Sequence, residues 1–149
     1  MMTLSRIVLG GLLLGAAGTD LAWRRIPNSF NCIGLGAFVL LAGWLCCRGN
    51  AETASGCLLA GALAFFLHLI PYMFHVMGAG DVKLAFIVGL LLGWEAWPGY
   101  MSVFCLLSLI VSGALLLAGK RKRESIPLAP VMAAAYILYW VLRLMQVLR

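Results

Sequence analysis

The chain has 149 residues, of which 64% are hydrophobic and only 11% are charged, less than half of the about 25% charged residues typical of soluble domains. Its mean hydropathy is +1.03, and because a single core of this length could not bury so much apolar surface, the composition excludes a soluble protein. The net charge of +6 could suggest nucleic acid, but the basic residues cluster in short segments between apolar runs, as membrane topology demands. We therefore expect no nucleic-acid partner.

Six apolar runs follow one another along the chain, and each is close to the about 20 residues that a helix needs to cross a bilayer core. The predicted helices are Leu4–Trp23, Phe30–Cys47, Gly56–Phe74, Val82–Trp97, Tyr100–Ala118 and Leu128–Leu148. All the connections between them are short. We therefore predict an all-α, polytopic integral membrane protein with six transmembrane helices that form one domain, residues 1–149.

The first run could be mistaken for a signal peptide, but it continues past the usual apolar core and ends in the motif Asp20-Leu-Ala-Trp-Arg-Arg-Ile-Pro-Asn28. We interpret it as a retained transmembrane helix. Asp20 and Arg24 are four residues apart, acid before base, and would form a favourable pair on the helix surface. Pro27 would end this helix, and Asn28 would cap the next one.

The fourth run begins with the motif Gly78-Ala-Gly-Asp81-Val-Lys83. Asp81 could simply cap this helix by accepting from free backbone amides. Gly78 and Gly80 could permit the turn, or they could let a second backbone, such as an extended substrate segment, approach closely. Lys83 cannot share a helical face with Asp81, so a helical ion pair does not explain it.

The end of the fourth run is predicted from an aromatic belt that is followed by a turn signal. The residues concerned are Trp94, Trp97, Pro98 and Tyr100. The fifth helix would begin at the last of them.

The charges of the connections predict the orientation. One side of the membrane receives Arg24, Arg25, Lys83 and the run Lys120-Arg121-Lys122-Arg123. The other side receives Arg6, Arg48, Arg143 and Arg149. Because basic connections stay in the cytoplasm, this distribution places both termini outside. The run of four basic residues would anchor the chain and attract anionic membrane lipid.

This orientation puts Asp20 and Asp81, 61 positions apart in the sequence, at the same cytoplasmic membrane face. A carboxylate at the rim of a membrane helix carries a desolvation cost and is by default a functional-site hypothesis. Glu52 and Glu95 fall in outside connections, and Glu124 lies within the basic run, so none of them competes as the partner of either aspartate. Two carboxylates at one depth predict carboxylate-pair chemistry.

No metal, cofactor or disulfide is expected. The five cysteines have no CxxC spacing and lie in or beside apolar runs, which favours small buried hydrophobic side chains. They are Cys32, Cys46, Cys47, Cys57 and Cys105. Of the two histidines, His68 is predicted at a helical core position and His75 at the membrane interface.

In these motifs the chain resembles the type IV prepilin peptidases, the GxGD-type aspartic proteases of bacterial membranes. A third stretch, Ile126-Pro-Leu-Ala-Pro130, is similar to the start of the last helix in that family. The resemblance implies removal of a short basic leader from pilin-like precursors at the cell inner membrane, with Asp20 and Asp81 as the catalytic pair. Residues expected to bind substrate or shape the site are Gly78, Gly80, Lys83, Arg25, Pro27 and Asn28.

The larger members of that family carry an additional N-terminal region with paired CxxC motifs, linked to methylation of the new N-terminus. The present chain starts at its first helix and has no CxxC, so we expect no methyltransferase activity and no zinc site. It is most similar to the short peptidases of tight-adherence (Flp) pilus systems.

Peptide hydrolysis by two carboxyl groups suggests a mechanism. Two close carboxylates cannot both ionise cheaply, so one keeps a proton while the other stays charged. The ionised group would activate a water for attack on the scissile carbonyl, and the protonated group would donate to the developing oxyanion or amine.

Two other functions fit parts of the pattern. Membrane carboxylates can serve as the relay of a small proton- or ion-coupled transporter, although two acids at one face leave nothing acidic to continue a path across the bilayer. A structural subunit of a secretion complex would use the aspartates only as helix-end caps.

Overall fold

The computed structural model describes residues 2–23, 26–117 and 128–147. In these ranges the chain is helical, with short turns between helices, so the all-α prediction is confirmed there. The helices are α1 (Met2–Trp23), α2 (Asn28–Cys47), α3 (Ala51–Met73), α4 (Ala79–Leu117) and α5 (Leu128–Val147). Each is long and apolar enough to cross a membrane, and the protein is therefore a multi-pass membrane protein.

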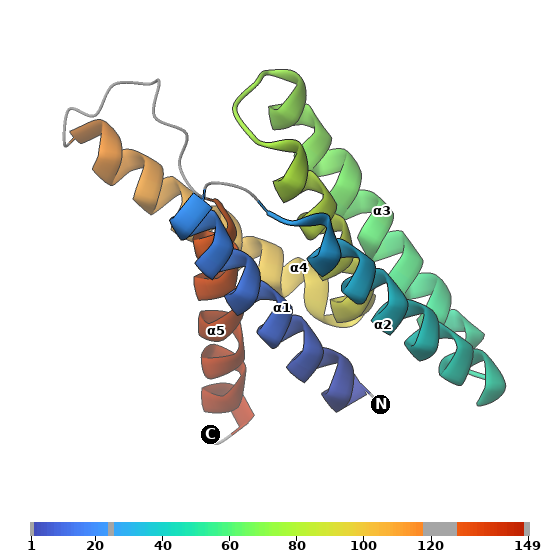
Figure 1. Ribbon diagram of the computed structural model, residues 1–149. Coiled ribbons are helices and arrows are strands. Elements are labelled where there is room, and N and C mark those ends of the chain that lie inside the picture. Colours follow the sequence, from blue (N-terminus) through green and yellow to red (C-terminus); the bar gives the residue numbers. More distant parts are fainter. Residues whose placement is uncertain (1, 24–25, 118–127, 148–149) are drawn as a thin grey trace.

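The prediction of six separate helices is not confirmed, because the fourth and fifth predicted helices form the single element α4. The backbone of α4 is broken at Gly93, where φ is 71° and ψ is 174°. Figure 1 shows the result: the first arm (yellow-green) lies beside α3, and after a sharp bend the second arm (yellow to orange) runs away from it.

The bend lies at Gly93, and the predicted end of the fourth helix at Trp97 and Pro98 is wrong. A positive φ is a conformation that glycine adopts without a Cβ clash, so the backbone turns there. Pro98 falls near the beginning of the second arm, where a proline removes little of the hydrogen-bond ladder. The other helix ends lie within a few residues of their predicted positions, the largest difference being the start of α3 at Ala51 instead of Gly56.

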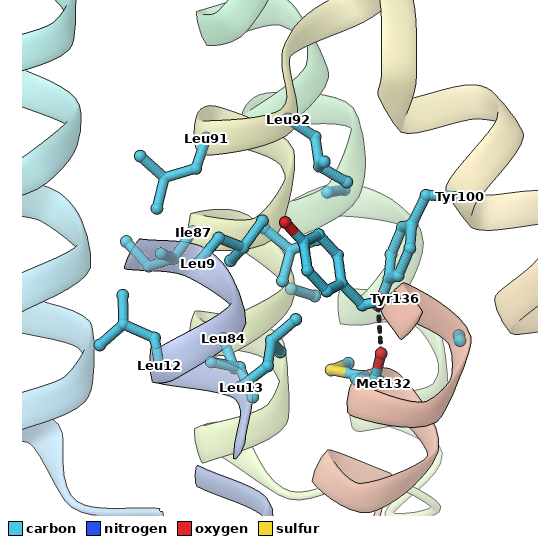
Figure 2. Packing of buried hydrophobic residues seen from close by; sticks show 14 of the residues in the cluster. Leu9, Leu12, Leu13, Leu84, Ile87, Leu91, Leu92, Tyr100, Met132 and Tyr136 are labelled. Atoms are coloured by element: carbon cyan, nitrogen blue, oxygen red, sulfur yellow. Dashed lines mark hydrogen bonds between the residues drawn. The ribbon is translucent and has the colours of Figure 1, made fainter. Parts of the chain in front are cut away.

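Leucine side chains of α1 and α4 form the centre of the packing. Figure 2 shows Leu9 and Leu13 of α1 near Leu84 of α4, with aromatic side chains completing the cluster. The hydroxyl of Tyr100 donates to the backbone carbonyl of Met132 on α5 at 3.4 Å. This cluster holds α1, α4 and α5 together, and these are the helices that carry or contact the two aspartates.

Helix α3 and the first arm of α4 approach each other through small residues. A Cβ atom added at Gly89 would lie 2.6 Å from the carbonyl oxygen of Ala60 and 2.8 Å from the Cα of Gly61. The two backbones are therefore in direct contact, as small residues permit in membrane helices. This contact fixes the first arm of α4, which begins two residues before Asp81.

Figure 1 also shows how the helix ends are distributed. The ends marked N and C lie at the bottom of the view, whereas the end of α1, the α3–α4 connection and the start of α5 lie toward the top. Both aspartate motifs are at this upper end.

The α3–α4 contact gives a first prediction. Gly89→Ala should destabilise the protein by about 1–3 kcal/mol, because a methyl group cannot fit against the α3 backbone. Gly43→Ala on α2 is the matched control, since a Cβ there meets nothing within 4 Å, and it should be neutral or stabilising by up to about 1 kcal/mol. Thermal unfolding of the detergent-solubilised variants measures both, and equal behaviour of the two would contradict the close contact.

Candidate active site

Asp20 is a buried carboxyl group near the end of α1, with 8% of its surface exposed. The backbone N–H of Ala129 donates to its Oδ2 atom at 3.4 Å. Ala129 is the second residue of α5, where backbone N–H groups have no partner within their own helix. Asp20 thus supplies an acceptor to the start of α5 from a different helix, and the negative charge is stabilised there by the helix dipole.

Asp81 is a half-buried carboxyl group in the first turn of α4. Its Oδ2 atom accepts from the backbone N–H of Gly78 at 3.3 Å. An acidic side chain at the third position of a helix that accepts from the residue before the helix forms half of a capping box. The predicted capping role of Asp81 is therefore confirmed.

The two carboxyl groups lie near enough for their negative charges to repel each other. Three helices produce this approach: α1 carries Asp20, α4 carries Asp81, and the start of α5 donates to Asp20. Like charges repel, so this arrangement needs packing and hydrogen bonds elsewhere to maintain it. The prediction that the two aspartates lie at one end of the bundle agrees with this geometry.

The two glycines of the second motif make room for the protein's own side chains. Neither Gly78 nor Gly80 has a positive φ, so the prediction that they permit the turn through conformational freedom is wrong. A Cβ at Gly78 would lie 3.2 Å from the Asp81 carboxylate, and a Cβ at Gly80 would lie 3.3 Å from the Cβ of Ile26. Gly80 therefore lets the two aspartate motifs pack closely against each other.

A hydrogen bond also joins the two motifs. Lys83 donates from Nζ to Oδ1 of Asn28 at 3.3 Å. The prediction that Asn28 caps α2 is wrong, because Pro27 occupies the capping position, with φ −60° and ψ 138°, and Asn28 is already helical. The fixed φ of proline suits this extended residue. Arg24 and Arg25, and with them the predicted Asp20–Arg24 pair, lie outside the described residues.

A groove of about 380 Å³ lies beside this site, between α2, α3 and α4. It is lined by Asn28, Asn31, Cys32, Leu35, Phe65, Lys83, Phe86 and Ile87. Within the part of the chain that the structure describes, the side-chain amide of Asn31 has both polar atoms buried and no hydrogen-bond partner. Such a group costs about 1–3 kcal/mol. We did not predict this residue, although a polar side chain within an apolar membrane run is a signal for it.

The sequence comparisons bear on this arrangement. A profile of the type IV leader peptidase family matches residues 7–118, roughly three quarters of the chain and a range that contains both aspartates. The chain belongs to the type IV leader peptidase family. The predicted family resemblance is thereby confirmed.

One curated relative in this family is the prepilin leader peptidase/N-methyltransferase of Bacillus subtilis (strain 168). It is 30% identical over 137 residues, which cover 91% of the present chain and 54% of the relative. The chain therefore spans about half the length of the curated relative that it matches. No solved structure matches the present chain.

His68 and the five cysteines were also given positions by the sequence. His68 is buried and its Nδ1 atom lies 2.8 Å from the carbonyl oxygen of Ala64, so its predicted core position is confirmed. Among the described residues, no group of three His, Cys, Asp or Glu side chains is placed to hold a metal ion. All five cysteines are free, and the prediction that they are buried holds only for Cys57.

The close packing of the two motifs gives a second prediction. Gly80→Val should destabilise the protein by about 1–3 kcal/mol, because its side chain would overlap Ile26. Adding Ile26→Ala should recover part of this loss, since it removes the Cδ1 and Cγ1 atoms that lie 3.6 and 3.7 Å from the added Cβ, and the double-mutant cycle should show coupling. Gly18→Val is the control, because a Cβ there meets nothing within 4 Å. Additive effects of the Gly80 and Ile26 changes in thermal unfolding would refute the contact.

Proposed function

We propose that the chain is an intramembrane aspartic endopeptidase that removes the basic leader from pilin-like precursors, with Asp20 and Asp81 as its catalytic pair. One observation supports this most strongly: the helix ends that carry Asp20 and Asp81, 61 positions apart in the sequence, pack against each other in an otherwise apolar bundle, with Ile26 against Gly80 and Lys83 bonded to Asn28. Membership of the leader peptidase family supports the class of reaction.

In the proposed mechanism the two carboxyl groups share one proton. The ionised group takes a proton from a water molecule, and the resulting nucleophile attacks the scissile carbonyl carbon. The protonated group donates to the carbonyl oxygen as the tetrahedral diol forms. The group that took the water proton then donates it to the leaving amine as the peptide bond breaks, while the other group takes a proton back from the diol, which leaves the new carboxylic acid and the original protonation state of the pair. The acid and base roles belong to the pair, because strongly interacting groups titrate together.

Backbone N–H groups orient the pair. Each carboxyl group has its Oδ2 atom held by a backbone N–H, that of Ala129 for Asp20 and that of Gly78 for Asp81. Both donors lie at helix starts that are fixed by packing. The two carboxyl side chains are therefore already ordered, and little conformational entropy is lost when they act together. This arrangement fits groups that must remain close despite their mutual repulsion.

We further propose that each arm of α4 crosses the inner membrane, so that the chain has six spans with both termini outside. The break at Gly93 supports this topology. So does Figure 1, in which the ends marked N and C lie away from the end of α1 and the α3–α4 connection, next to which the aspartates fall in the sequence. The basic connections then lie in the cytoplasm, and the site opens at that face. A leader peptide that stays in the cytoplasm would reach it without crossing the bilayer.

The catalytic proposal is tested with conservative variants. Asp20→Asn and Asp81→Asn keep a side-chain oxygen but cannot act as acid or base, so each should reduce leader removal by at least about 100-fold. The measurement is a gel shift of a co-expressed pilin-like precursor from the same genome, chosen for a short basic leader before an apolar helix. Glu52→Gln and Glu95→Gln, at the other end of the bundle, should retain wild-type processing.

Processing at the wild-type rate by either aspartate variant would remove that residue from the mechanism. Ion-dependent flux without any cleavage by the wild-type chain would instead support the transporter. Membrane localisation and thermal unfolding of all variants show whether a loss of activity reflects misfolding.

The topology is tested by cysteine labelling. In a variant without native cysteines, Asn50→Cys precedes α3 and Val76→Cys lies in the α3–α4 connection, and both positions are exposed. A membrane-impermeant maleimide should label position 50 in spheroplasts and position 76 only after permeabilisation. The reverse pattern would overturn the orientation.

A further inference from the structure

The groove at the aspartate end of the bundle has a polar entrance, its mouth, and an apolar interior. Its α2 wall is a single helical stripe, Asn28, Asn31, Cys32 and Leu35, and its α4 wall is another, Lys83, Phe86 and Ile87. Both helices begin at the aspartate end of the bundle, so each stripe runs from the site inward. The hydrogen bond between Lys83 and Asn28 lies at the mouth.

The mouth of the groove is level with the proposed catalytic pair. Lys83 follows Asp81 by two residues, which corresponds to a rise of about 3 Å along α4. Asn31 is one helical turn beyond Asn28, about 4.5 Å further along α2. The groove opens on a different face of α4 from Asp81, so a chain that leaves the aspartates first passes the start of α4. An extended peptide advances about 3.3 Å per residue, and such a chain would present a backbone group to Asn31 one or two residues beyond the mouth.

The unpaired side-chain amide of Asn31 indicates which kind of ligand the groove binds. Its amide carries both a donor and an acceptor, and the groove supplies neither partner. A peptide group also carries one donor and one acceptor, and it is left unpaired when a helix is opened for cleavage. A lipid acyl chain could fill the apolar part of the groove but would leave the amide unpaired.

We infer that this groove, the α2–α4 groove, binds the segment of the substrate that follows the cleaved bond, with an extended backbone amide paired to Asn31 and the apolar helix lying beyond it. The inference rests on the proposed peptidase function and adds the path of the substrate. Lys83 holds a substrate carbonyl oxygen at the mouth, and Leu35, Phe86 and Ile87 contact the apolar side chains. Asn31 is a positioning residue in this arrangement, since it aligns the chain and takes no part in the proton transfers.

Asn31→Leu tests the pairing with a side chain of similar volume. The variant should be as stable as the wild type or more stable, because it removes an unpartnered buried amide. Its KM for the precursor should rise roughly fivefold to tenfold, with kcat within about twofold. A residue needed only for folding would instead lower the unfolding temperature.

Leu35→Trp tests the groove itself. The larger side chain would obstruct the groove and should raise KM at least about tenfold. Leu40→Trp is the matched control on the same helix, since Leu40 is 72% exposed and does not line the groove, and it should retain wild-type kinetics.

Cross-linking locates the substrate directly. Two variants of the Asp81→Asn protein each retain one native cysteine, either Cys32 in the groove or Cys46 outside it, and carry a photoactivatable maleimide. With the precursor present, Cys32 should form adducts with the residues just after the cleavage site, and Cys46 should form none.

The outcomes separate the inference from the proposed function. The groove assignment is wrong if the wild type removes the leader while Asn31→Leu and Leu35→Trp have the wild-type KM, or if Cys32 captures only lipid. The proposed peptidase function would still stand in that case. If the wild type removes no leader, both are wrong.

Discussion

The structure depends on bringing two carboxyl groups near each other at one end of an apolar bundle. This approach is unfavourable in itself, because each group is partly removed from water and each repels the other. It is offset by contacts that are distant in sequence. The leucine cluster joins α1 to α4, the glycine contact joins α4 to α3, and the N–H of Ala129 ties Asp20 to α5.

The sequence was sufficient for the all-α fold class, and it placed the two aspartate motifs at the same end of the bundle, where the structure has them. Apolar runs of bilayer length specify membrane helices, and the basic connections indicate which helix ends share a side. The third stretch of the family resemblance now has a structural role: Leu128–Pro130 begins α5 and supplies the donor to Asp20.

The errors share a physical cause. The turn predicted at Trp97 and Pro98, the roles of Gly78 and Gly80, and the cap at Asn28 came from local rules for turns and caps. In the structure each is decided by a neighbouring element: Gly80 meets Ile26, Asn28 meets Lys83, and a Cβ at Gly93 would meet the Sγ of Cys57 at 3.1 Å. Asn31 was missed for the same reason, because only the packed helices show that its amide is buried without a partner.

The break at Gly93 leaves the first arm of α4 with roughly 14 residues, about 21 Å of helix. In the proposed topology this arm crosses a hydrocarbon layer about 30 Å thick, so it is too short to match an undisturbed bilayer. Hydrophobic mismatch of this kind is relieved by local thinning of the lipid. Headgroups and water would then be drawn toward the first turn of α4, so the bilayer itself would hydrate the carboxyl pair that the helices bring together.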